Sequence, residues 1–129
     1  MDRNDPPWWD KYEHFDAWEF DCKHTGENHM QEDFIKKLNN LREMFGGALG
    51  VNSGYRHPTH PVEAKKAKPG THSKGIAADL RVGPGLDAYR IVQLAMQMGF
   101  TGIGISQRNG YPRFIHLDMD PTRKAIWSY

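Results

Sequence analysis

The clearest pattern along the chain is a stripe of apolar residues at helical spacing between positions 29 and 45. The stripe consists of Phe34, Ile35, Leu38, Leu41 and Phe45. This spacing places the side chains on one face of a helix. Asn28 and Gln31 form a variant of the capping box, which predicts that the helix begins after Asn28. Gly46 and Gly47 predict its end, because glycine readily takes the left-handed conformation found after a helix.

Alternating apolar and polar positions predict several strands further along the chain. The clearest alternation is in 75–82, where Ile76, Ala78 and Leu80 point one way and Asp79 the other. In 113–119, Leu117 belongs to one face, while His116 and Asp118 belong to the opposite face. Further strands are expected at 49–55, at 101–106 and, as an edge strand, at 125–129. A second amphipathic helix is expected at 87–98, and a turn at 107–110.

Taken together, these elements predict an α+β fold with a small, mostly antiparallel sheet and helices packed on one face. The apolar strand faces meet the helices, so the opposite face carries Asp79, His116 and Asp118. We expect a single domain over 1–129, with an irregular lead-in at 1–14. Residues 15–24 fit a short strand or a single helical turn. The loop at 56–72 is long, and loops of this length in small domains are often functional.

Composition excludes several classes of protein. The chain has 129 residues, 38% of them hydrophobic and 12% aromatic, which is typical of a globular domain. The formal net charge of +1 shows no excess of basic residues of the kind that nucleic-acid binding requires. No apolar stretch is long enough to span a membrane, and we find no signal peptide near the N-terminus. The single cysteine, Cys22, allows no internal disulfide.

Three residues suggest a metal site. His72 lies seven residues before Asp79, and His116 lies on a different strand. Two imidazoles and one carboxylate suit zinc and leave a fourth position open for water, as in catalytic sites. The alternatives are a structural histidine and a hydrogen-bonded edge aspartate. Cys22, His24 and His29 could suggest a second site, but we expect a buried free cysteine and two surface histidines.

Three segments in this order resemble a known family. They are Ser53-Gly54-Tyr55-Arg56, residues 71–80 (THSKGIAADL) and residues 114–118 (FIHLD). Together they resemble the zinc D-alanyl-D-alanine carboxypeptidases, a superfamily that includes vancomycin-resistance dipeptidases, phage endolysins and the hedgehog domain. The small, phage-type members look most similar, and the resemblance covers about residues 15 to 120.

The resemblance implies a role for each matching residue. It makes His72, Asp79 and His116 the ligands of one zinc ion. Arg56 would then bind the substrate carbonyl or carboxylate, which suits a guanidinium. Ser53 would support the loop or contact the substrate.

One position departs from the family pattern. Relatives keep a catalytic acid three residues before the second histidine ligand, and here that position is Arg113. Arginine is no general base at neutral pH. Asp118, two residues past His116 on the same strand face, could replace it as the catalytic base. The alternative is that Asp118 only orients a histidine ligand. Asp120 is a further candidate for the base.

The resemblance implies zinc-dependent hydrolysis of a peptide bond in peptidoglycan stem peptides, by a D-Ala–D-Ala carboxypeptidase or an endolysin-type endopeptidase. The alternative is a non-catalytic zinc-binding module for assembly or recognition. We expect a monomer with no nucleic-acid or membrane partner. We also expect it to be cytoplasmic on synthesis and to act on the cell wall after release, in a phage or prophage context.

Overall fold

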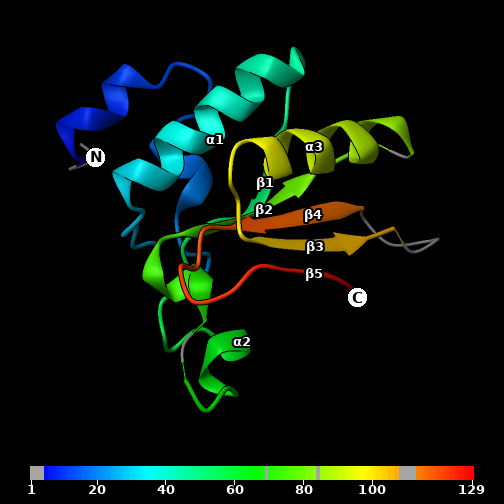
Figure 1. The fold of residues 1–129 in the computed structure, drawn as a ribbon. Coiled ribbons are helices and arrows are strands. Elements are labelled where there is room, and N and C mark those ends of the chain that lie inside the picture. Colours follow the sequence, from blue (N-terminus) through cyan, green and yellow to red (C-terminus); the bar gives the residue numbers. More distant parts are fainter. Residues whose placement is uncertain (1–4, 69, 84, 108–112) are drawn as a thin grey trace.

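The computed structural model describes residues 5–68, 70–83, 85–107 and 113–129. Its helices and strands follow one another along the chain as shown in Figure 1. The α-helices are α1 (Glu32–Phe45), α2 (Pro61–Ala64) and α3 (Leu86–Gln97). The 3₁₀ helices are η1 (Pro7–Lys11), η2 (Ala17–Phe20) and η3 (Thr71–Lys74). The strands are β1 (Gly50–Ser53), β2 (Ala77–Arg81), β3 (Gly102–Ser106), β4 (Phe114–Asp118) and β5 (Ala125–Ser128).

The strands form one sheet in the order β1-β2-β4-β3-β5. Three of its four pairings are antiparallel, and only β5 runs parallel to its neighbour β3. Helices α1 and α3 lie together on one face of the sheet, while α2 lies beyond the other (Figure 1). The predicted α+β class and the mostly antiparallel sheet are therefore confirmed, as is the packing of the two long helices, α1 and α3, on one face.

The core lies between this sheet and helices α1 and α3. All five residues of the predicted α1 stripe are buried, and β2 and β4 contribute Leu80, Ile115 and Leu117 from their apolar faces. The start of α1 was predicted too early, since its N-cap is Gln31. Asn28 instead accepts a hydrogen bond from the backbone of Met30, a local turn that competes with helix formation.

The segment before α1 packs on the domain through aromatic side chains. The lead-in expected to be irregular contains η1, and Trp9 in this helix is buried against Phe20. Residues 15–24 contain the helical turn η2, one of the two alternatives expected there. Within the described residues, no helix is long and apolar enough to cross a membrane. Residues 108–110 of the predicted turn lie outside the described residues.

The long loop after β1 carries two short helices rather than irregular chain. Pro61 begins α2, where proline is favoured because its missing N–H would have no helical partner. The helix η3 then leads directly towards β2 and carries His72. The loop therefore holds His72 in a helical turn.

Candidate metal centre

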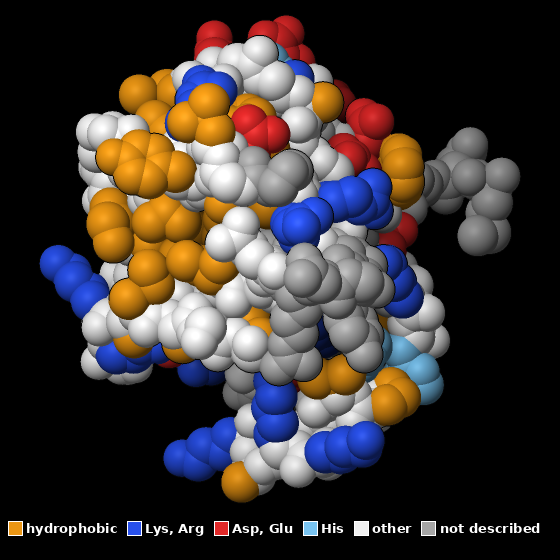
Figure 2. Space-filling model, turned by 90° about the vertical axis from the view of Figure 1, so that its right-hand side faces the viewer, with side chains coloured by type: hydrophobic (Ala, Val, Ile, Leu, Met, Phe, Trp, Pro, Cys, Tyr) orange, Lys and Arg blue, Asp and Glu red, His pale blue; other side chains and the backbone are white. Residues whose placement is uncertain are grey.

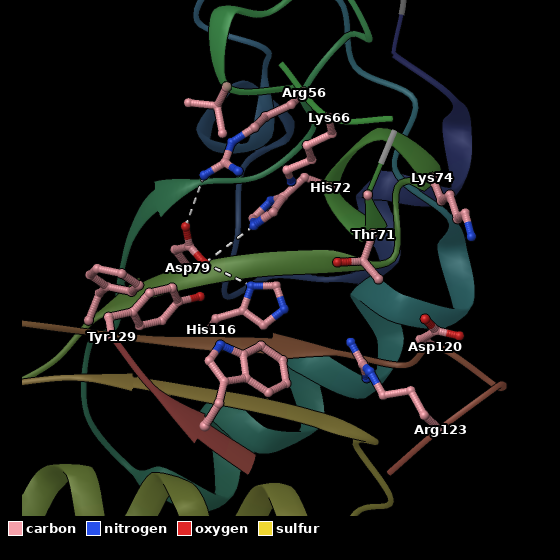
Figure 3. Close-up of a pocket in the computed structure, with 14 residues that line it drawn as sticks. Arg56, Lys66, Thr71, His72, Lys74, Asp79, His116, Asp120, Arg123 and Tyr129 are labelled. Carbon is pink, nitrogen blue, oxygen red and sulfur yellow. Dashed lines mark hydrogen bonds and ion pairs between the residues drawn. The ribbon is translucent and has the colours of Figure 1, made fainter. Parts of the chain in front are cut away.

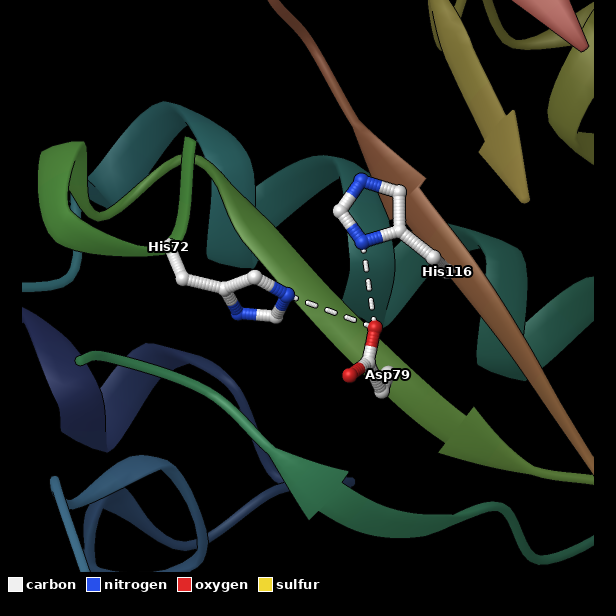
Figure 4. Close-up of side chains that lie close together, drawn as sticks. All are labelled: His72, Asp79 and His116. Carbon is white, nitrogen blue, oxygen red and sulfur yellow. Dashed lines mark hydrogen bonds and ion pairs between the residues drawn. The ribbon is translucent and has the colours of Figure 1, made fainter. Parts of the chain in front are cut away.

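Strand register places two of the predicted ligands side by side. Asp79 on β2 is paired with His116 on the neighbouring strand β4. His72 reaches the same point from η3, so side chains from three different elements converge (Figure 4). Asp79 Oδ1 lies 3.0 Å from His116 Nδ1 and 3.3 Å from His72 Nε2. One ligand atom from each residue lies within 4.8 Å of the others, and all three residues are buried.

In each histidine, the ring nitrogen that faces away from Asp79 also has a hydrogen-bond partner. His72 Nδ1 lies 2.7 Å from the carbonyl oxygen of Gly54, so this nitrogen carries the proton and donates it. His116 Nε2 lies 2.7 Å from Asp118 Oδ2 and likewise donates. The remaining nitrogen of each neutral ring then presents a lone pair to Asp79 Oδ1. Three lone pairs aimed at one point repel one another unless a cation lies between them, so the residues fit a metal ion.

Charge on the site follows from the same contacts. Burial alone would raise the pKa of Asp79. When the facing nitrogens of His116 and His72 carry protons, their hydrogen bonds to Asp79 outweigh burial and hold that pKa well below the usual range. Burial alone would lower the pKa of His116, but hydrogen bonds with Asp118 and Asp79 outweigh it and raise that pKa. The carboxylate of Asp79 is therefore ionised, and the site attracts positive charge.

Asp118 lies behind His116 and is fully buried. Its Oδ1 and Oδ2 accept hydrogen bonds of 2.7 Å and 2.8 Å from the two terminal nitrogens of Arg123. Burial would raise its pKa, but the bonds from Arg123 and His116 outweigh this and lower it strongly. These contacts occupy both oxygens, so they favour the orienting role over that of a catalytic base.

Arg56 borders the metal centre on the side of β1. Its Nη2 lies 3.2 Å from Asp79 Oδ2, the oxygen that does not face the histidines. Its Nε donates to Ser53 Oγ at 3.2 Å, and Ser53 pairs with Asp79 across β1 and β2. The sequence predicted that Arg56 binds the substrate and that Ser53 supports the loop or contacts the substrate. The structure places them beside Asp79, where Ser53 supports the guanidinium.

The metal centre opens into a cavity of about 580 Å³, a size typical of ligand sites (Figure 3). Its basic lining consists of Arg56, Lys66, Lys74 and Arg123. Two carboxylates line it as well, namely Asp79 and Asp120. Neither Asp118 nor Arg113 is among the described residues that line this cavity. Figure 2 shows lysine and arginine side chains gathered at the lower end of the molecule, around the loop that carries α2.

Aromatic residues on β4, on β5 and just after β5 form a further wall, which sequence reasoning missed. The ring of Trp127 lies 5.3 Å from the ring of His116, centroid to centroid. Tyr129 points its hydroxyl towards Asp79 in Figure 3, and its ring lies 5.1 Å from that of Phe114. The three aromatic residues all line the cavity.

Two glycines of β3 leave room for neighbouring side chains, Gly104 for Trp127 in this wall and Gly102 for Asp118. Gly104 pairs with His116 and Gly102 with Asp118. A Cβ at Gly104 would lie 2.5 Å from the indole nitrogen of Trp127, and one at Gly102 would collide with Asp118. The Gly-Ile-Gly pattern of this strand could have predicted these contacts, because a glycine within a strand often marks a place where another group approaches the backbone closely.

The second metal site considered from the sequence does not form in the described residues. Cys22 is buried, whereas His24 and His29 are exposed, which confirms the alternative expectation. Among the residues that the structure describes, His72, Asp79 and His116 form the one group able to hold a metal ion.

Two imidazoles and a carboxylate beside an open cavity define a metal centre typical of metal-dependent hydrolases. Comparison with known families agrees with this class. Residues 13–118 match the model of the Peptidase M15 family, so the chain belongs to that family of zinc peptidases, which includes the D-alanyl-D-alanine carboxypeptidases. The chain is therefore a metallopeptidase that acts on peptide bonds. Among curated protein sequences, none matches the chain.

Proposed function

We propose that the chain hydrolyses a peptide bond in the stem peptides of bacterial peptidoglycan, with one zinc ion held by His72, Asp79 and His116. The bond is D-Ala–D-Ala, for a carboxypeptidase, or a neighbouring amide such as L-Ala–D-Glu, for an endopeptidase. The observation that carries the proposal is the convergence of three ligand atoms at a cavity bordered by Arg56. The alternative is the non-catalytic zinc module.

The charge of the cavity supports an anionic peptide as substrate. Lys66, Lys74 and Arg56 line it, and stem peptides carry free carboxylates that such side chains attract. In this proposal, the guanidinium of Arg56 binds the carbonyl oxygen of the attacked peptide bond or a terminal carboxylate. Its position beside Asp79 brings that group close to the metal ligands.

A bound zinc ion supplies Lewis acidity and activates water for attack on the peptide carbonyl. The chain itself must orient its ligands and accept a proton. Asp118 orients His116 by accepting the proton of Nε2, and Arg123 keeps Asp118 in place. Asp120 lines the cavity and is not a proposed ligand, so we assign to it the acceptance of the proton from water.

The hydrogen bonds of Asp120 are consistent with this assignment. Its Oδ1 accepts bonds from the backbone and hydroxyl of Thr122, at 2.9 Å and 2.7 Å. These bonds lower its pKa, so the carboxylate is ionised at neutral pH, which is the form a proton acceptor needs, while the lower pKa also makes it a weaker base. They also hold the side chain at the end of β4, on the side of the cavity that carries Arg123.

Digestion of purified peptidoglycan tests the proposal. The zinc-loaded protein should convert stem peptides to shorter products, detected by mass spectrometry of muropeptides, and a chelator should abolish the conversion. His72→Ala should bind less than one equivalent of zinc and release no product. His29→Ala, which changes an exposed histidine, is the matched control and should behave like the wild type.

The outcomes separate the two functions. Zinc binding without any change in the muropeptides would support the non-catalytic module and overturn the peptidase proposal. The masses of the products decide between the two bonds. Action as a monomer, after release from the cytoplasm in a phage or prophage context, stays a prediction.

A further inference from the structure

Glu63 is a fully buried carboxylate outside the metal centre, and the proposed chemistry above does not use it. It lies in α2, the short helix in the loop between β1 and β2. A buried carboxylate is costly to the fold unless it is paired and hydrogen-bonded. Its presence in this loop therefore calls for a physical reason.

Four groups of the same loop bind the two oxygens of Glu63. Oε2 lies 2.9 Å from Lys66 Nζ and 3.4 Å from Arg56 Nη1. Oε1 accepts hydrogen bonds from the backbone of Gly70 at 2.8 Å and from Ser73 Oγ at 3.2 Å. Burial would raise the pKa of Glu63, but these partners outweigh it and lower the pKa to about 2. The carboxylate is therefore ionised at neutral pH and joins both ends of the loop.

Glu63 completes the set of acceptors around Arg56. Each of the three guanidinium nitrogens of Arg56 has one acceptor: Nε binds Ser53, Nη2 binds Asp79 and Nη1 lies near Glu63. Three acceptors around a planar guanidinium fix its orientation, because the donor directions are rigid. On the other side, the bonds to Gly70 and Ser73 bracket His72 in η3.

We propose that Glu63 is a positioning residue that sets the guanidinium of Arg56 for substrate binding. This inference rests on the proposed role of Arg56 in binding the substrate. It predicts that loss of the Glu63 charge impairs the reaction through Arg56, and not through general loss of the fold. A misplaced substrate-binding group can reduce the rate by about 10²-fold.

A double-mutant cycle tests this mechanism on the full, zinc-loaded chain. Glu63→Gln, Arg56→Lys and the double variant are assayed with a stem pentapeptide, with kcat and KM measured separately. Glu63→Gln should lower kcat/KM about 100-fold while retaining zinc and a folded spectrum. In the Arg56→Lys background, the same change should have an effect of less than about threefold. Glu43→Gln, at an exposed position of α1, is the matched control.

A second measurement does not depend on activity. The side-chain Nε–H signal of Arg56 in an NMR spectrum, assigned by its loss in Arg56→Lys, should be sharp in the wild type. It should shift and broaden in Glu63→Gln but not in Glu43→Gln. If Glu63→Gln fails to fold, Glu63→Asp replaces it, because the shorter side chain keeps the charge but retracts from Arg56.

The outcomes are distinct. Equal losses of kcat/KM in the wild-type and Arg56→Lys backgrounds would overturn the positioning role, as would an unchanged Arg56 signal. If the wild type cleaves no stem peptide, the proposed function fails, and the Arg56 signal alone then decides the role of Glu63.

Discussion

The same substitution at the two aspartates beside Met119 should impair different properties, namely zinc affinity at Asp118 and kcat at Asp120. Asp118 is buried against His116 and Arg123, whereas Asp120 lines the cavity. Replacing each by asparagine removes one charge and hardly changes the shape of the side chain. The pair therefore separates a residue that orients a metal ligand from one that accepts a proton.

The expected magnitudes follow from these contacts. Asp118→Asn removes the carboxylate that pairs with Arg123 and weakens the hydrogen bond that Asp118 accepts from His116 Nε2. Loss of such a support behind a ligand lowers metal affinity by about 10- to 100-fold. Breaking the buried ion pair should also lower the free energy of unfolding by about 3 kcal/mol. Asp120→Asn, in contrast, should bind zinc like the wild type but lose about 10²- to 10⁴-fold in kcat.

The assay combines zinc affinity, activity and stability. Competition with a chromophoric chelator gives the affinity, and kcat is then measured with zinc in saturating excess. Under that condition Asp118→Asn should recover to within about tenfold of the wild type, since its defect lies mainly in metal binding. Urea titration gives the loss of stability.

One pattern of results would refute this reasoning. If Asp118→Asn bound zinc with wild-type affinity but lost about a thousandfold in kcat, Asp118 would be the catalytic base. Full activity in Asp120→Asn would then remove that residue from the mechanism. The sequence left both roles of Asp118 open, and this experiment chooses between them.

Three further predictions concern stability. Gly104→Ala should destabilise the fold by about 1–3 kcal/mol and alter tryptophan fluorescence, because the new Cβ displaces Trp127. Gly50→Ala is the control in urea titrations, because its new Cβ would crowd only the flexible end of Arg81. The pKa of Glu63 falls from 4.5 to about 2 on folding, so its contribution of about 3 kcal/mol is present above pH 4.5 and is lost as the pH falls towards 2. The urea-unfolding free energy of Glu63→Gln should accordingly depend less on pH in this range than that of the wild type. With free zinc at a thousandfold excess over its dissociation constant, the bound ion should stabilise the wild type by about 4 kcal/mol, and a chelator should remove this stabilisation. The thermal midpoint of His72→Ala should hardly change when the chelator is added.

Local patterns were sufficient for the main elements. The apolar stripe of α1 and the alternation in β2 and β4 identified these elements within a few residues, because burial of one face is imprinted directly in the sequence. The start of α1 was misplaced since Asn28 bonds to Met30 in a local turn, and both Asn28 and Gln31 are residues able to begin a helix. Short helices such as α2 were not predicted, because four residues are too few to show a periodic pattern.

For the site, sequence and structure contributed different parts. The motifs in 53–56, 71–80 and 114–118 singled out Arg56, His72, Asp79 and His116 without any coordinates. They gave no reason to consider Glu63. Its proposed positioning role depends on hydrogen bonds with residues up to ten positions away, which only the folded loop brings together. Trp127 and Tyr129 were likewise missed, because their place in the cavity depends on the pairing of β5 with β3.

The sequence by itself determined the fold class, the strand faces and the types of ligand, since periodicity and residue chemistry are local properties. Only the tertiary structure decided the surroundings of each carboxylate. Asp118 and Asp120 look alike in sequence, yet one is enclosed by Arg123 and the other borders the cavity. The difference depends on which strands become neighbours, because a carboxylate takes its role from the charges and solvent around it.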